Sequence, residues 1–237
     1  MIGVLLLGFL MGLRHALEVD HVMAVATLTA NESRINAMKQ GAVWGIGHTL
    51  TLMMVGGAVL YMDTLIPEHV AHMLEFAVGI MLFILGLDVI RSVIKNHMHI
   101  HTHEHANGKT HIHLHSHSSE PNEHLATHKH NHLKDLPLRA LFVGFMHGLA
   151  GSSALILLTL QSVQSPLIGF SYIILFGAGS IIGMAVLSVV IAIPMRYSLG
   201  KRVWLHSSMR SVIGVATIIL GLHIIYDIGI VNGLLMS

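Results

Sequence analysis

Apolar runs of about 20 residues recur along the chain, the length at which a helix crosses about 30 Å of hydrocarbon. Because lipid offers the backbone no hydrogen bonds, each run must be a helix or a strand of a closed barrel. None of the runs alternates with the two-residue period of a barrel strand, so we expect helices. Only 11% of the residues are charged, against about a quarter in a soluble domain. The chain is therefore expected to be an all-α polytopic membrane protein.

Six spans are expected, separated into two sets of three by a polar segment at 96–136. No basic residue precedes the first run, which is expected to be a retained span rather than a signal peptide. Outside the spans, Lys and Arg occur only in the connections of one face, which the positive-inside rule makes cytoplasmic. This places the chain in the cell (inner) membrane with both termini outside and the long loop in the cytoplasm. The expected spans are 2–28, 39–61, 70–94, 138–160, 167–193 and 209–230.

The two sets of spans resemble each other in sequence, at an offset of 132 to 136 residues. Three spans per half would make the second half enter the membrane from the opposite side, as a 3+3 inverted repeat typical of secondary transporters. The alternative is that glycine-rich apolar helices resemble one another anyway. The expected units are 1–95, 96–136 and 137–237. The matched segments are 8–13 with 144–149, 44–47 with 176–179, and 79–90 with 214–225.

The first span contains an ionisable cluster, Arg14-His-Ala-Leu-Glu-Val-Asp-His21. Each such group costs a few kcal/mol at bilayer depth, so the cluster needs a reason. An ion pair of Arg14 with Glu18 one turn later would explain those two residues. Imidazole and carboxylate groups together suit nickel, cobalt, zinc or iron. The chain has no cysteine, so a metal site must use nitrogen and oxygen ligands.

Helix geometry makes a further prediction about this cluster. At 100° per residue, His15, Glu18 and His21 spread over about 120° of one face, while Asp20 points away from it. We therefore expect the helix to be bent or unwound near the cluster, as discontinuous helices are in transporters.

Two more histidines are expected at similar depth, His48 in the second span and His147 in the fourth. Taken alone, each histidine could equally well be a metal ligand or a hydrogen-bonded contact between helices. The predicted metal site is His15, Glu18, Asp20, His21, His48 and His147. Weaker candidates are Ser152, Ser153 and Ser180 as contacts from the second half, Asp88 and His223 as gate or packing residues, and His69, His72 and Glu75 as a solvated helix end or a metal-collecting group.

The polar segment holds 13 of the 21 histidines, many of them alternating. It has too few apolar residues to build a core and is expected to be disordered. Dense imidazoles bind divalent metals with poor selectivity, which predicts a metal buffer, and the alternative is a pH sensor. The predicted buffer residues are His97, His99, His101, His103, His105, His111, His113, His115 and His117.

The segment from Arg14 to His21 resembles the His-x4-Asp-His signature of the nickel/cobalt transporter (NiCoT) family, and Trp44-Gly-Ile-Gly-His-Thr49 resembles its second conserved segment. Residues 144–153 are similar to the six-span, urease-associated nickel permease-like branch. This resemblance implies His15, Asp20 and His21 as substrate ligands supported by His48. It also implies a cytoplasmic nickel chaperone, or urease or hydrogenase maturation proteins, as recipients.

A secondary uptake permease for nickel, with cobalt as the second candidate, is the first hypothesis, and an efflux transporter of the same fold is the alternative. An intramembrane metalloenzyme and a membrane sensor are weaker readings, so no enzyme activity and no prosthetic group are expected. Asn107-Gly-Lys-Thr110 lacks the upstream glycine of a Walker A motif. A net charge of +1 argues against a nucleic-acid partner, and the expected partners are the metal ion and the bilayer.

Overall fold

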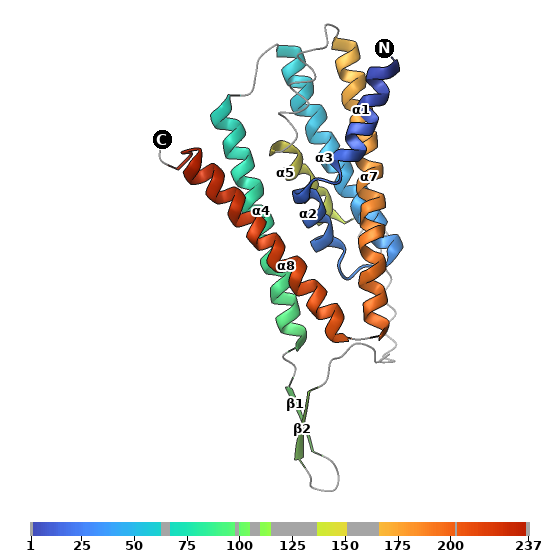
Figure 1. The fold of residues 1–237 in the computed structure, drawn as a ribbon, viewed down its shortest axis with the longest axis vertical. Helices are drawn as coiled ribbons and strands as arrows, with labels where there is room; N and C mark the ends of the chain where they lie inside the picture. Colours follow the sequence, from blue (N-terminus) through green and yellow to red (C-terminus); the bar gives the residue numbers. More distant parts are fainter. Residues whose placement is uncertain are drawn as a thin grey trace.

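The computed structural model describes residues 2–62, 67–97, 100–104, 110–114, 137–150, 166–201 and 203–235. These residues form a bundle of helices and one two-stranded hairpin (Figure 1). The helices are α1 (Ile2–His15), α2 (Val19–Thr29), α3 (Arg34–Met62), α4 (Glu68–His97), α5 (Leu138–Ala150), α7 (Pro166–Lys201) and α8 (Val203–Tyr226), which continues as the π-helical turn η2 (Asp227–Val231).

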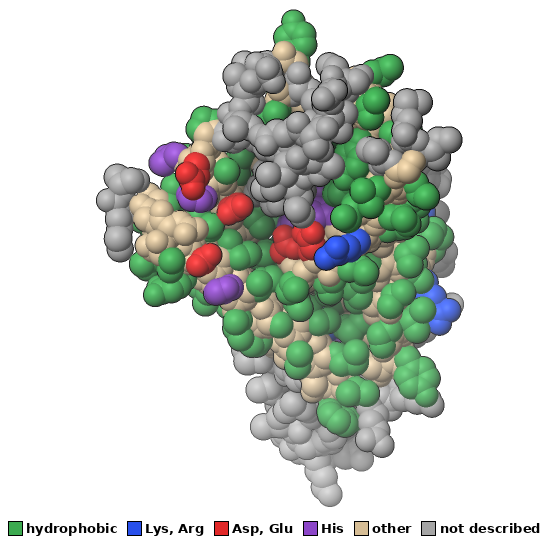
Figure 2. Space-filling view, turned by 45° about the horizontal axis from the view of Figure 1, so that its top comes forward, with side chains coloured by type: hydrophobic (Ala, Val, Ile, Leu, Met, Phe, Trp, Pro, Cys, Tyr) green, Lys and Arg blue, Asp and Glu red, His purple; other side chains and the backbone are tan. Residues whose placement is uncertain are grey.

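Four of the helices, α3, α4, α7 and α8, are long and apolar enough to cross a membrane. Helices α1, α2 and α5 are shorter apolar segments. Large apolar side chains cover the outside of the bundle (Figure 2), such as Leu167 and Val212, which are 77% and 68% exposed. Such a surface suits lipid and not water. The remainder of the fourth expected span, 151–160, lies outside the described residues.

The long helices extend several residues beyond the expected spans at one or both ends. Hydropathy detects only the apolar stretch, whereas the helix continues into polar residues such as those of Arg34–Gln40. Proline marks three helix starts as expected: Pro67 and Pro137 directly precede α4 and α5, and Pro166 begins α7. A first-turn residue needs no backbone N–H, so proline is accommodated there.

The helices pack as two groups. Helix α3 contacts α7 and α5, and α1 contacts α7, whereas α4 pairs with α8 and makes far fewer contacts elsewhere (Figure 1). The α4–α8 crossing is reciprocal: a methyl group on Gly86 would lie 2.7 Å from the carbonyl oxygen of Gly214, and one on Gly221 would lie 2.7 Å from that of Gly79. Only glycine permits this approach at either point.

A break separates α1 from α2, as the direction of Asp20 predicted. The amides of Leu17 and Glu18 donate to the carbonyls of Arg14 and His15, at 2.9 and 3.0 Å, in tight three-residue turns. Glu18 then adopts an extended backbone with φ −63° and ψ 147°. Helix α2 starts again with the Val22 amide bonded to the Glu18 carbonyl at 2.9 Å. Because of this break, the Asp20 side chain points toward the histidines of the cluster, whereas a continuous helix would point it away from them.

The hairpin lies at the end of the molecule opposite both termini (Figure 1). Strand β1 (Ile100–Glu104) pairs antiparallel with β2 (Thr110–Leu114), so that His101 is opposite His113 and His103 is opposite His111. These strands fall within the segment expected to be disordered. The rest of that segment, 98–99, 105–109 and 115–136, lies outside the described residues, and with it His99, His105, His115 and His117.

Candidate metal centre

Four buried histidines meet at the break between α1 and α2. His15 ends α1, His21 lies in the first turn of α2, His48 lies in the middle of α3, and His147 lies near the end of α5. None of their side chains is more than 3% exposed. The ring of His21 is central, with its centroid 4.2 Å from that of His15, 4.3 Å from that of His147 and 5.1 Å from that of His48.

Asp20 binds two of these rings through its two oxygens. His21 Nδ1 lies 2.8 Å from Oδ1, and His147 Nε2 lies 2.9 Å from Oδ2. A carboxylate only accepts hydrogen bonds, so each ring donates its N–H to Asp20 and keeps a lone pair on its other nitrogen. Those nitrogens, His21 Nε2 and His147 Nδ1, are buried and have no hydrogen-bond partner among the described residues. A carboxylate that orients imidazoles in this way is typical of metal sites.

The second contact of the cluster joins His15 to His48. Their Nε2 atoms are 3.2 Å apart, close enough to share one proton or to bind one ion. His15 Nδ1 also lies 2.9 Å from Glu18 Oε1, an ion-pair distance without the alignment of a hydrogen bond. Glu18 therefore contacts His15 rather than Arg14, and the exposed Arg14 is not the partner that the ion-pair alternative required.

The spacing of the donor atoms fits a metal ion. Ligand atoms of His15, His21 and His48 lie within 4.8 Å of one another, as do those of Asp20, His21 and His147. Two ligands at about 2.1 Å from one ion lie at most about 4.2 Å apart, so small side-chain movements would complete either set. Imidazole with a carboxylate suits nickel, cobalt or zinc better than the all-oxygen ions calcium and magnesium.

The structure brings all six residues of the predicted site together, four histidines with Asp20 and Glu18. Among the weaker candidates, Ser180 is fully buried on α7. Helices α1 and α7 are close there, because a methyl group added to Gly12 would lie 2.9 Å from the backbone nitrogen of Ser180. Its hydroxyl has no hydrogen-bond partner among the described residues. Ser152 and Ser153 lie outside those residues.

Trp44 forms one side of the cluster and was not assigned to the metal site from the sequence. Its ring is fully buried, stacks on His48 at 5.7 Å and 16°, and presents an edge arrangement to His21 at 5.3 Å. Residues four apart share a helix face, so the spacing of Trp44 and His48 is the signal that could have identified it. Phe176 on α7 closes the other side, 5.2 Å from His15.

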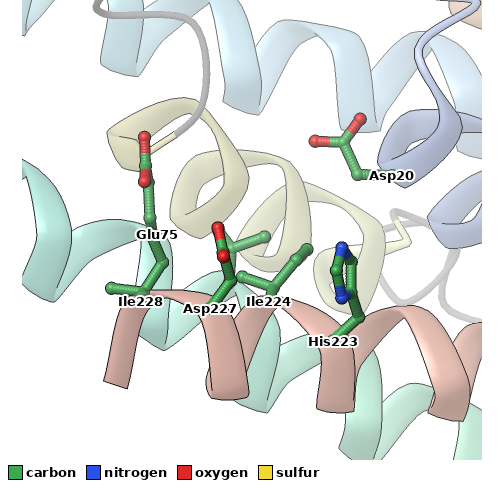
Figure 3. A pocket seen from close by; sticks show the side chains of 7 residues that line it. Asp20, Glu75, His223, Ile224, Asp227 and Ile228 are labelled. Atoms are coloured by element: carbon green, nitrogen blue, oxygen red, sulfur yellow. The ribbon is translucent and has the colours of Figure 1, made fainter. Parts of the chain in front are cut away.

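A cavity of about 230 Å³ reaches Asp20 from one side of the bundle (Figure 3). Figure 2 shows acidic and histidine side chains gathered among hydrophobic ones on the face that carries the termini. Asp227 was not singled out from the sequence, although a carboxylate at the end of an apolar span was a usable signal. The lining residues are Asp20, Glu75, Val78, His223, Ile224, Asp227 and Ile228.

No protein-family model and no solved structure matches the chain. Two proteins of Arabidopsis thaliana, chloroplast protein FOR GROWTH AND FERTILITY 1 and 2, are 27% and 25% identical over 75% of this chain. The match covers 46% and 44% of their own lengths. Urease accessory protein UreH of Bacillus sp. (strain TB-90) is 34% identical over 99% of this chain and 95% of its own length. The chain therefore belongs to the family of the urease accessory protein UreH.

Proposed function

We propose that the chain is a secondary permease that carries a divalent transition metal, nickel first and cobalt second, into the cell. The observation that carries this proposal is the buried cluster of His15, His21, His48 and His147 with Asp20, set where α1 and α2 are interrupted. Ionisable side chains at bilayer depth cost free energy, so those that occur there usually mark an ion pathway. The metal is cargo, so neither an enzyme activity nor a prosthetic group is part of the proposal.

The choice of nickel rests on two supports. The segment from Arg14 to His21 resembles the nickel/cobalt transporter signature, and a relative that matches the whole chain is named a urease accessory protein. The donor set, imidazole nitrogen with carboxylate oxygen, is compatible with both metals. A cytoplasmic nickel chaperone or the urease maturation proteins would then receive the ion on the side of the histidine-rich loop.

Transport inward is feasible without ATP. A dication moving down a potential of about 100 mV gains about 4–5 kcal/mol, at about 2.3 kcal/mol per charge. Gly79 and Gly86 on α4 correspond to Gly214 and Gly221 on α8 at an offset of 135 residues, and their reciprocal contacts support two halves arranged as an inverted repeat. In this arrangement six spans leave both termini outside and the loop in the cytoplasm, and the site lies between the halves.

Metal flux into proteoliposomes tests the proposal. The purified chain is reconstituted with an internal dye quenched by Ni²⁺ or Co²⁺, and a potential, negative inside, is imposed by potassium diffusion. Wild-type vesicles should take up Ni²⁺ rapidly. His21→Ala should reduce the rate about 100-fold, because the central ring of the cluster is lost. His69→Ala, at the exposed start of α4, is the matched control and should transport normally.

Folding and direction are checked in the same preparation. Size-exclusion profiles and melting temperatures of His21→Ala must match those of the wild type before a loss of flux is attributed to the site. Uptake that survives His21→Ala would move the transport site elsewhere. Flux that appears only when protons or another ion move in the opposite direction, out of loaded vesicles, would replace uptake with efflux.

A further inference from the structure

The cavity beside Asp20 is lined by three carboxylates and one imidazole. Its ionisable side chains are Asp20, Glu75, His223 and Asp227, and no lysine or arginine among the described residues lines it. Three carboxylates around a partly open cavity attract cations and raise their local concentration. At about 230 Å³ the cavity has room for a cation together with several waters, which occupy about 30 Å³ each in the liquid.

The side chains of the cavity come from three helices and project into the same space. Figure 3 shows Glu75 on α4, His223 and Asp227 at the end of α8 and its π-helical continuation, and Asp20 on α2. The carboxylates of Glu75 and Asp227 extend from α4 and η2 into this cavity. Their oxygen atoms and the His223 ring do not form a compact group like the buried cluster, so an ion held here would keep part of its water shell.

Asp20 connects the cavity to the histidine cluster. The same carboxylate lines the cavity and receives hydrogen bonds from His21 and His147. Immediately beyond it, His21 is completely buried and its Nε2 has no hydrogen-bond partner among the described residues. A cation leaving the cavity past Asp20 would therefore meet an imidazole nitrogen that is unpaired among the described residues.

We propose that Glu75, His223 and Asp227 form a second, outer binding site for a partly hydrated divalent transition metal, distinct from the buried histidine cluster and connected to it through Asp20. The site rests on the proposed function for its role in uptake, but its existence is a separate claim. Mixed carboxylate and imidazole ligands select nickel, cobalt or zinc over magnesium and calcium. The water that the ion keeps makes binding weak and fast, which suits a site of passage.

A cysteine placed in the cavity can detect occupancy, because the natural chain contains no cysteine that would react in the background. Ile224 lines the cavity without being a metal ligand, so Ile224→Cys keeps all four ionisable side chains. The full chain is purified in detergent, which makes both ends accessible, and is treated with a charged methanethiosulfonate reagent. The rate of modification is measured with and without buffered free Ni²⁺. Glu68→Cys, at the exposed start of α4, serves as the control for reagent reactivity.

At a free Ni²⁺ concentration ten times the dissociation constant, modification of Ile224→Cys should slow about tenfold, because about one molecule in eleven remains empty. Magnesium at that concentration should have no effect, and neither metal should slow the reaction of Glu68→Cys. Adding Glu75→Gln and Asp227→Asn should abolish the protection. The matched substitution Glu68→Gln removes an acidic group from the same helix outside the cavity and should leave the protection intact.

His21→Ala separates the outer site from the buried one. Protection by Ni²⁺ should persist in this variant even though transport is lost. Protection that disappears with His21→Ala would overturn the proposal, since the metal would then be held only in the buried cluster. A cysteine at position 224 that does not react at all, or protection that survives Glu75→Gln with Asp227→Asn, would also overturn it. A failure of flux in vesicles would count against the permease and leave these results unaffected.

Discussion

Asp20 organises the candidate site at the level of single residues. A single carboxylate holds two imidazoles and faces the cavity, so it orients the rings and also lies on the path of the ion. Carboxylates that orient metal-binding histidines are worth about 10–100-fold in affinity or activity when they are replaced. The arrangement therefore makes Asp20 as consequential as the histidines, although it need not be a ligand itself.

Asp20→Asn tests this role with little change in shape. The amide keeps one accepting oxygen but replaces the other with a donor, so it cannot accept hydrogen bonds from both His21 and His147. We expect the Ni²⁺ concentration for half-maximal uptake to rise about 10–100-fold. Initial rates over a series of Ni²⁺ concentrations in proteoliposomes give this value.

Glu18→Gln is the paired control for Asp20→Asn. The Glu18 side chain is 41% exposed and its contact with His15 is not aligned as a hydrogen bond, so its loss should change half-saturation only a few-fold. Equal effects of the two substitutions would mean that negative charge near the cluster matters and that the orientation of the rings by Asp20 does not.

The residues of the cluster were predictable from the sequence because ionisable groups are conspicuous in apolar spans. His15 and His21 were singled out by the ionisable cluster of the first span, and His48 and His147 by their similar depth, while the direction of Asp20 on a regular helix predicted the break. The separate contacts that each residue makes were not predictable. That Asp20 binds two rings, that Glu18 contacts His15, and that Asp227 lines a cavity with Asp20 all depend on how distant helices pack.

At the level of elements, glycines decide how closely the helices that carry the histidines approach. Gly144 on α5 packs directly against the backbone of Trp44 on α3, where a methyl group would contact the Trp44 carbonyl oxygen and lie 2.8 Å from its carbonyl carbon. Trp44 stacks on His48, and His147 lies one turn beyond Gly144. Separation of these helices would therefore open the cluster.

Gly144→Ala should therefore destabilise the bundle and reduce transport together. Overpacking costs about 1–3 kcal/mol, because backbone atoms cannot move aside as a flexible side chain can. Gly57→Ala in α3 is the control, since nothing lies within 4 Å of its added methyl group, and the better helix former should be neutral or stabilising by up to about 1 kcal/mol. Melting temperatures of the two variants in detergent compare them directly, and equal melting temperatures would contradict the role given to Gly144.

At the scale of the whole molecule, two cavities lie at different depths of α2. The cavity of about 230 Å³ reaches Asp20, whereas one of about 440 Å³ is lined by Thr27, Asn31 and Arg139. Seven residues of helix, about 10 Å, separate Asp20 from Thr27. Among the described residues, Asp20 of the cluster lines the first cavity, and no residue of the cluster lines the second. The α4–α8 pair, with its few contacts to the other helices, is the group whose movement could reverse this.

An ion pair connects the two groups beside the larger cavity: Arg139 on α5 donates to Asp88 on α4 at 2.7 Å. If this contact helps to hold that side closed, Asp88→Asn should raise the reactivity of Thr27→Cys toward a charged thiol reagent and lower that of Ile224→Cys. Both residues of the pair are more than half exposed, and such pairs are worth about 0–1 kcal/mol, so either change should stay within about fivefold. The opposite signs of the two changes are the signature of one cavity opening as the other closes.

Glu32→Gln gives the matched control, because Glu32 lines the same cavity and forms no ion pair among the described residues. It removes the same charge while leaving the contact between α4 and α5 in place, so it should alter neither rate beyond its electrostatic effect on the reagent. Two rates that rise together in Asp88→Asn would indicate loosened packing instead of a shift between two conformations. A shift of opposite signs in Glu32→Gln as well would assign the effect to charge in the cavity, and the ion pair would lose its role in closure.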